Sequence, residues 1–232
     1  MHAPHAVLAA ALAAAAYSLI LAVGTVTLRG DAVVLGVAMN LLAVGLTSFL
    51  LRTVFGVQGT FDDPALAGLP LIGGLSPLAY LSWIAVAVAA LMLSRHVWGL
   101  RVRGVGEAPD AAATLGVSPA KYKYAAILLS GVLCGLAGAQ LALGNVTLFS
   151  ENMTAGRGWI AVVAVMLGRA LPVGVLLAAL LFGLAEAAGF RLQGLGLPQQ
   201  ATDAAPYVVT LGALFLTTAR RRRRTRPSGA VS

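Results

Sequence analysis

Charged residues are scarce in this sequence of 232 amino acids. Only 10% of the residues are charged, whereas 59% are hydrophobic, and the mean hydropathy is +0.89. Soluble domains usually carry about 25% charged residues. Because so few polar groups could not cover the surface of a water-soluble protein of this length, the composition excludes an ordinary soluble domain. It predicts a chain whose solvent is lipid.

Cysteine and histidine are also scarce, and this limits the metal chemistry that we expect. The single cysteine, Cys134, lies in an apolar segment, so neither an internal disulfide nor a cysteine metal cluster is possible. The three histidines, His2, His5 and His96, form no His-Glu-x-x-His motif. We therefore expect no metal site in this chain.

Sequence motifs for catalysis or nucleotide binding are absent. Neither lysine, Lys121 or Lys123, follows a glycine, so there is no phosphate-binding Gly-x-x-x-x-Gly-Lys-Ser/Thr loop, and a Gly-x-Ser-x-Gly nucleophile motif is missing. Of the eight acidic residues only Glu186 lies in a predicted span, which gives it no partner carboxylate for acid–base catalysis. We expect a protein that is not an enzyme and has no cofactor of its own; a membrane-embedded enzyme is the alternative.

Basic residues are concentrated in two places. Six of the 16 Lys and Arg residues lie within 220–226, and five more lie between Arg95 and Lys123, in a chain of net charge +8. No aromatic residues alternate with the C-terminal arginines as in a nucleic-acid surface. The pattern instead follows the rule that Lys and Arg gather in short cytoplasmic loops. We expect no nucleic-acid partner.

The apolar runs predict an all-α, polytopic transmembrane bundle of about seven crossings. Polar breaks separate seven segments: Ala6–Leu28, Ala32–Leu51, Leu78–Ser94, Lys123–Gly144, Trp159–Leu167, Val173–Phe190 and Pro206–Ala219. Since a full crossing needs about 20 residues, Trp159–Leu167 is predicted to be a half-helix covered by its neighbours. With residues 95–122 in the cytoplasm, alternation places 13 of the 16 basic residues inside, the C-terminus inside and the N-terminus outside. Residues 1–219 thus form a membrane domain and 220–232 a basic cytoplasmic tail.

The polar stretch 95–122 is predicted to form a compact knob of two short helices. Pro109 suits a first helical turn, and Asp110 would lie at the positive end of that helix. Gly116 is a plausible stop, after which Ser118-Pro119 would begin a second short helix.

Several motifs in order resemble permease subunits of bacterial ABC importers for sugars, nucleosides and branched-chain amino acids. They run from about residue 36 to 219 and comprise Asn40–Phe49, Gly99-Leu100-Arg101, Gly106-Glu107, Pro109, Ala111-Ala112, Gly116, Ser130-Gly131, Gly135–Ala139, Gly156, Gly158, Ile160-Ala161, Gly168-Arg169, Pro172, Gly174 and Phe182-Gly183. The resemblance implies that residues 95–122 dock onto a separate ATPase subunit, which binds ATP and magnesium. The coupling residues it implies are Arg101, Arg103, Gly106, Glu107, Pro109, Asp110, Ala111, Ala112 and Gly116.

The resemblance also implies the partners and the class of solute. A second permease subunit, homologous or identical, and an extracytoplasmic solute-binding protein or lipoprotein would act with this chain in the bacterial cell membrane. Asn40–Phe49 is similar to the nucleoside branch in particular. Sugars, branched-chain amino acids and an inactive truncated permease are the alternatives. Two departures from the family stand out. Ala108 stands where the family often has asparagine, and because the family usually begins with additional spans before the point that resembles Ala6, we expect N-terminal spans to be missing here.

A few polar residues in or beside the spans are candidates for the solute path. Asn40 and Thr47 are seven residues apart and share a helix face, where they could line a path or bond neighbouring helices. Asn145 lies at an outer break, and Glu186 could line the path or extend to the interface. In the fourth span, small residues predict a face for close helix packing: Gly131, Gly135 and Gly138.

Overall fold

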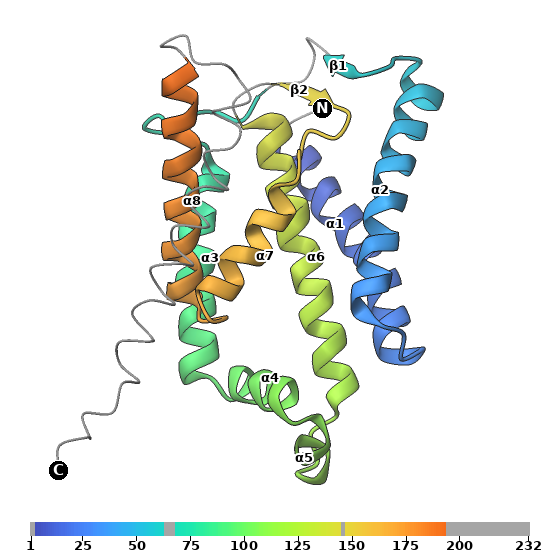
Figure 1. Cartoon of the computed structure of the whole chain (residues 1–232), viewed down its shortest axis with the longest axis vertical. Coiled ribbons are helices and arrows are strands. Elements are labelled where there is room, and N and C mark those ends of the chain that lie inside the picture. Colours follow the sequence, from blue (N-terminus) through green and yellow to red (C-terminus); the bar gives the residue numbers. More distant parts are fainter. Residues whose placement is uncertain (1–2, 63–67, 145–146, 194–232) are drawn as a thin grey trace, which may run out of the picture. The chain divides into compact units, whose positions relative to one another are not determined.

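The structure is a computed structural model that describes residues 3–62, 68–144 and 147–193 (Figure 1). The chain divides into two compact units, residues 1–155 and 156–232. The first contains α1 (Ala3–Ala22), the π-helix η1 (Val23–Thr27), α2 (Ala32–Phe55), β1 (Thr60–Asp62), α3 (Pro77–Arg95), α4 (Val97–Glu107), α5 (Pro109–Thr114), α6 (Pro119–Leu143) and β2 (Leu148–Ser150). The described part of the second contains α7 (Arg157–Leu167) and α8 (Pro172–Gln193).

Five of the helices are long and apolar enough to cross a membrane, at positions that the sequence predicted. They cover Pro4–Thr27, Ala32–Phe55, Pro77–Arg95, Pro119–Leu143 and Pro172–Gly189. A helix of 24 residues is about 36 Å long, which exceeds the bilayer core of about 30 Å. α7 has 11 residues and reaches only about half of that thickness. The predicted span 206–219 and the tail 220–232 lie outside the described residues.

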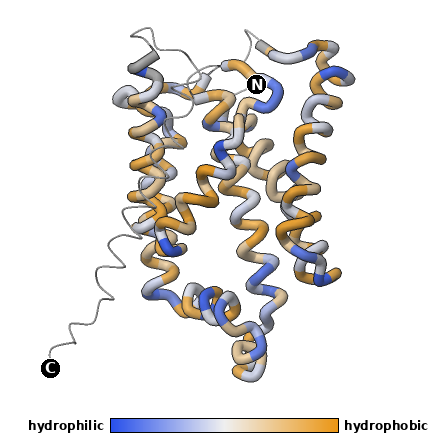
Figure 2. Tube along the Cα trace, viewed as in Figure 1, coloured by the Kyte–Doolittle hydropathy of each residue, from blue (hydrophilic) through white to orange (hydrophobic). Residues whose placement is uncertain are grey.

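Apolar side chains cover the outside of these helices. Figure 2 shows hydrophobic residues along the lengths of α1, α2, α3 and α6, with hydrophilic residues at their ends and on α4 and α5. Large side chains such as Leu12, Leu41 and Leu91 are exposed. In water this surface would be costly, whereas in lipid it is the expected one.

Polar contacts within residues 3–155 group the helix connections at two opposite ends. At one end the Thr27 and Tyr124 hydroxyls are 2.5 Å apart, so the α1–α2 turn lies beside the start of α6. At the other end Ser76, before α3, donates a 2.5 Å hydrogen bond to Gln140 near the end of α6. There β1 also pairs antiparallel with β2, with Phe61 opposite Phe149. The first four spans therefore alternate in direction, as predicted.

α1 and α6 pack closely through small residues. A Cβ added to Gly135 would lie 2.6 Å from the Ala10 carbonyl oxygen and 2.8 Å from the Ala11 Cα, and one added to Gly131 would lie 2.7 Å from the Ser18 Cβ. The close face continues at Ala139, which is buried. The steps of four residues form a ridge along the helix.

Gly138, which the sequence grouped with Gly131 and Gly135, does not take part in this contact with α1. No described atom lies within 4 Å of the position where its Cβ would be. Although Gly138 is seven residues from Gly131, the contact with α1 follows the ridge of four-residue steps to Ala139 instead.

α7 and α8 form a helical hairpin in the second unit. Ala164 of α7 and Ala178 and Phe182 of α8 make a small buried core. The turn between the helices places Arg169 and Ala170 at φ values of 54° and 55°, the left-handed region. Since non-glycine residues adopt this region at a cost, helix packing must hold the turn in place.

Candidate functional site

The stretch between α3 and α6 contains the two short helices α4 and α5, and one of the pair differs from the prediction. Ser118-Pro119 does not begin a second short helix: α6 runs without a break from Pro119 to Leu143. The missed helix is α4, which precedes α5. His96 ends α3 and begins α4, where its Nδ1 accepts a 3.2 Å hydrogen bond from the Trp98 N–H.

α4 folds back tightly against the end of α3. A Cβ added to the buried Gly99 would collide with the Met92 carbonyl oxygen and lie 2.6 Å from the Leu93 Cα. Because both are backbone atoms, they could not move aside as a flexible side chain could. Glycine at this position therefore sets the angle at which α4 leaves the membrane span.

α5 ends at Thr114, and Gly116, the predicted stop, follows two residues later. This glycine has φ of +77°, and its N–H bonds to the Ala113 carbonyl while the Val117 N–H bonds to the Ala112 carbonyl. These two bonds are the Schellman motif, which satisfies carbonyls at a helix end. At the start of α5, Ala108 provides no side-chain cap, as expected where the family often has asparagine, and Asp110 lies in the first turn.

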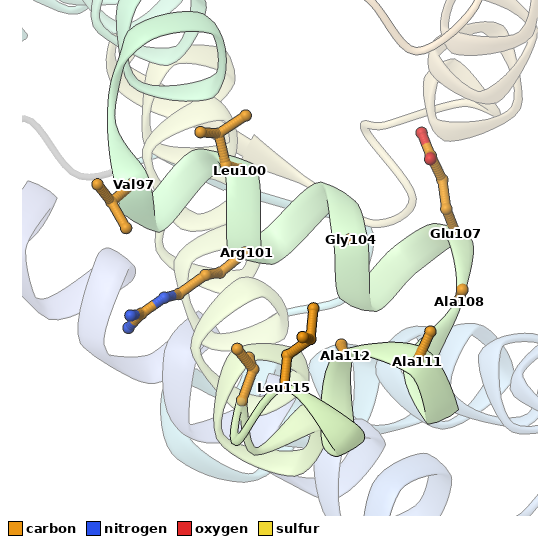
Figure 3. A pocket seen from close by; sticks show the side chains of 10 residues that line it. Val97, Leu100, Arg101, Gly104, Glu107, Ala108, Ala111, Ala112 and Leu115 are labelled. Atoms are coloured by element: carbon orange, nitrogen blue, oxygen red, sulfur yellow. The ribbon is translucent and has the colours of Figure 1, made fainter.

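A groove of about 320 Å³ lies between α4 and α5 (Figure 3). We call this the coupling groove. Its lining is mostly apolar and consists of Val97, Leu100, Arg101, Gly104, Glu107, Ala108, Ala111, Ala112, Leu115 and Val117. Arg101 and Glu107 are the charged members, and Figure 3 shows their charged groups pointing in different directions from α4.

The residues proposed for coupling divide into two sets around the groove. Four of the nine line it: Arg101, Glu107, Ala111 and Ala112. The others are Arg103 and Gly106 on α4, Pro109 and Asp110 on α5, and Gly116 just after α5. Leu100 and Leu115, which are not among the nine predicted coupling residues, are exposed and contribute its apolar character. The sequence feature that could have identified them is that each is a large apolar residue within the polar stretch 95–122.

The first turns of α6 hold α4 in place. Arg101 Nη1 donates a 3.2 Å hydrogen bond to the Tyr122 hydroxyl, and the rings of Trp98 and Tyr122 lie 6.1 Å apart between centroids. The coupling groove is thus braced against the start of a membrane span.

The candidate path residues on α2 lie on exposed parts of that helix. Asn40 is exposed, and the Thr47 hydroxyl bonds back to the Ala43 and Val44 carbonyls of its own helix, at 2.8 and 3.0 Å. That bond satisfies the hydroxyl proton but leaves oxygen lone pairs free to accept. Asn145 lies outside the described residues.

Glu186 has a partner that sequence reasoning missed. Its Oε1 accepts hydrogen bonds from Arg157 Nη2 at 2.7 Å and Nε at 3.2 Å, across the α7–α8 hairpin. Both side chains are half-buried, so the pair lowers the cost of placing a carboxylate near lipid. The two residues lie 29 positions apart in the sequence. The one sequence feature that could have suggested the ion pair is that Arg157 is a basic residue at the start of a short apolar helix.

The described residues contain no metal-binding cluster. Among residues 3–62, 68–144 and 147–193, no group of three or more His, Cys, Asp and Glu side chains converges. Cys134 is a free, exposed thiol on α6.

Five helices that could span a membrane and a grooved helical loop are the architecture of a polytopic membrane protein. Residues 1–217 match the family described as branched-chain amino acid transport system / permease component, and the chain belongs to this family. The family and the helical membrane fold that the resemblance implied are thereby confirmed, and the predicted count of about seven crossings is confirmed in part.

Proteins with a stated transport role are similar to the chain over most of its length. The nucleoside ABC transporter permease protein NupC of Lactococcus lactis is 38% identical over 90% of this chain and 72% of its own length. The guanosine ABC transporter permease protein NupQ of Bacillus subtilis is 36% identical over 89% and 70%. A protein of Haloferax volcanii named as a candidate glucose ABC transporter permease, TsgC13, is 38% identical over 74% and 56%. No solved structure matches the chain.

Proposed function

We propose that this protein is the membrane permease subunit of an ATP-driven ABC importer that moves nucleosides into the cell. The observation that carries the proposal is the identity of 36–38% to nucleoside and guanosine permeases over about nine-tenths of the chain. The grooved loop between α3 and α6 supports it, since a permease of this class needs a surface that accepts work from another subunit.

A simple sugar is the second candidate solute. The similarity to the permease named for glucose covers less of the chain than the two nucleoside matches, and it leaves 26% of this chain unmatched. Both solutes are rich in hydroxyl groups, which polar residues such as Asn40 and Thr47 on α2 could bond as the solute passes.

The groove between α4 and α5 supports a proposal for the partners. An ATPase subunit that binds ATP and magnesium would dock on the coupling groove, where apolar contacts from Leu100 and Leu115 give affinity. Arg101 and Glu107 would fix the register of docking through charge. The chain itself performs no chemical step and has no cofactor. A second permease subunit and an extracytoplasmic binding protein complete the importer.

Orientation follows from the distribution of basic residues. Arg29, the coupling groove and the start of α6 lie at the end of the bundle that carries Arg95, Arg101, Arg103, Lys121 and Lys123. That end faces the cytoplasm by the positive-inside rule, and the C-terminal arginines are cytoplasmic too. β1 and β2 then face outward, where a binding protein delivers the solute.

The direct experiment is uptake of labelled guanosine, adenosine, ribose and leucine by cells with and without the gene. We expect loss of guanosine and adenosine uptake on deletion, and its recovery when the gene returns. A defect confined to ribose selects the sugar alternative, and one confined to leucine selects the amino-acid alternative. Unchanged uptake of all four solutes contradicts the proposal.

A further inference from the structure

We propose that Tyr122 and Tyr124, in the first two turns of α6, carry movement of the coupling groove to α1 and α2. This inference rests on the proposed function and concerns how work enters the membrane. It makes the two tyrosines and Thr27 positioning residues for transport.

The two tyrosines face different neighbours because they are two residues apart on a helix, which places them about 200° apart around its axis. Tyr122 contacts α4 through the Arg101 guanidinium and the Trp98 ring. Tyr124 contacts the last residue of η1, because its hydroxyl lies 2.5 Å from the Thr27 hydroxyl. One short stretch of α6 therefore joins the coupling groove to the end of the first span.

The helix that begins as α1 ends in a π-helical turn, η1, which can change its conformation more readily than an α-helix. Residues Val23–Thr27 form a π-helix, and the Leu28 N–H bonds to the Val23 carbonyl five residues back, at 3.0 Å. π-helical turns are rare and have poorer stability than α-helix, and they occur often at functional sites. A pull on Thr27 can therefore change the pitch of η1 without unwinding the rest of α1.

η1 in turn contacts α2. A Cβ on the buried Gly24 would lie 2.8 Å from Leu35 Cδ1, so the second turn of α2 packs directly on the π-helix. Further along, the Tyr17 hydroxyl donates a 2.6 Å hydrogen bond to the Met39 carbonyl, one residue before Asn40. The contacts thus continue from the coupling groove to the segment of α2 that carries the candidate path residues.

The test compares guanosine transported with ATP hydrolysed, in the complete complex purified through a tag on this protein and placed in liposomes. Tyr124→Phe and Thr27→Val each remove one hydroxyl of the pair, while Thr27→Ser keeps it. Tyr80→Phe is the matched control, because the Tyr80 hydroxyl bonds the Ile72 carbonyl in the loop before α3, at the end of the bundle that holds β1 and β2.

We expect Tyr124→Phe and Thr27→Val to lower guanosine transported per ATP about threefold, the scale of one interhelical hydrogen bond in a membrane. The double variant should fall no further, since both changes remove the same bond. Thr27→Ser and Tyr80→Phe should keep the wild-type ratio.

Three results overturn the inference while the proposed function stands. The first is an unchanged ratio of guanosine transported to ATP hydrolysed in both single variants. The second is an equal fall in transport and ATP hydrolysis, which indicates weaker docking of the ATPase. The third is a loss in the double variant that equals the product of the two single losses. If the wild-type complex hydrolyses no ATP, the proposed function fails first and the inference falls with it.

Discussion

The Arg157 guanidinium donates two hydrogen bonds to one carboxylate oxygen of Glu186, at 2.7 and 3.2 Å, and so connects the start of α7 to α8. Sequence alone left Glu186 as either a path residue or one that extends to the interface. The ion pair gives the carboxylate a structural task in the hairpin. A role in the solute path remains a prediction for this residue.

Glu186→Gln should weaken the hairpin modestly. Both side chains are more than a third exposed, so we expect a loss of up to about 1 kcal/mol in stability. Two measurements check this: the melting temperature in detergent, and the rate at which a protease cleaves within α7. Arg169→Gln, at the α7–α8 turn, is the control and should leave both unchanged. The double exchange Arg157→Glu with Glu186→Arg should recover part of the loss, and a wild-type melting curve for Glu186→Gln contradicts the prediction.

Gly99→Ala should distort the junction between α3 and α4. Its Cβ would meet backbone atoms of Met92 and Leu93, and such overpacking costs about 1–3 kcal/mol. Gly36→Ala on α2 is the control, because it lies outside the coupling groove and its Cβ would meet no described neighbour within 4 Å. We expect nucleoside uptake to fall for Gly99→Ala alone, at equal amounts of protein in the membrane. Equal activity of the two variants is the contradicting result.

Gly116→Ala should loosen α5 and lower transport. Alanine at φ of +77° is strained, and the C-terminal bonds to Ala112 and Ala113 depend on that conformation. We expect the free energy of unfolding to fall by about 1 kcal/mol.

Glu107→Gln should reduce solute-stimulated ATP hydrolysis while the chain still inserts into the membrane. Gly36→Ala on α2 serves as the control, since no described neighbour lies within 4 Å of where its Cβ would be and it is not one of the proposed coupling residues. Unaltered transport in Gly116→Ala and Glu107→Gln would contradict the role of this loop in coupling.

Gly135→Ala should separate α1 from α6, whereas Gly138→Ala should not. The first substitution places a methyl group 2.6 Å from the Ala10 carbonyl oxygen, and the second faces open space. We expect the melting temperature of the purified protein to drop for Gly135→Ala only. The two variants share the gain in helix propensity, so a difference between them reports packing. Matching melting temperatures would contradict the close approach at Gly135.

The spans could be predicted because lipid imposes a simple rule on length and hydropathy. The predicted starts and ends of five spans, such as Ala32 for α2, lie within four residues of the observed spans, the first of which joins α1 and η1. α4 was missed because Gly99, Gly104 and Gly106 and its charged residues suggest a loop, while its helical form depends on packing against α3 and α6. Propensity is a weak guide where tertiary contacts decide.

Contacts between distant residues were beyond the reach of sequence patterns. The ion pair joins residues 29 positions apart, Arg157 and Glu186, and the hydroxyl pair joins residues 97 positions apart, Thr27 and Tyr124. Local sequence spacing therefore predicts neither contact. Helix periodicity likewise gives the faces of α6 but not the path of α1 across them, which runs along Gly131 and Gly135 and not Gly138.

The most direct measurement is the side of the membrane from which the coupling groove can be reached. With Cys134→Ser as background, Thr114→Cys on α5 and Gln58→Cys before β1 provide exposed positions at the two ends of the first unit. A membrane-impermeant maleimide should label Thr114→Cys only in inverted vesicles and Gln58→Cys only in intact cells. Labelling of Thr114→Cys from outside intact cells would place the groove where no ATPase can reach it and contradict the account.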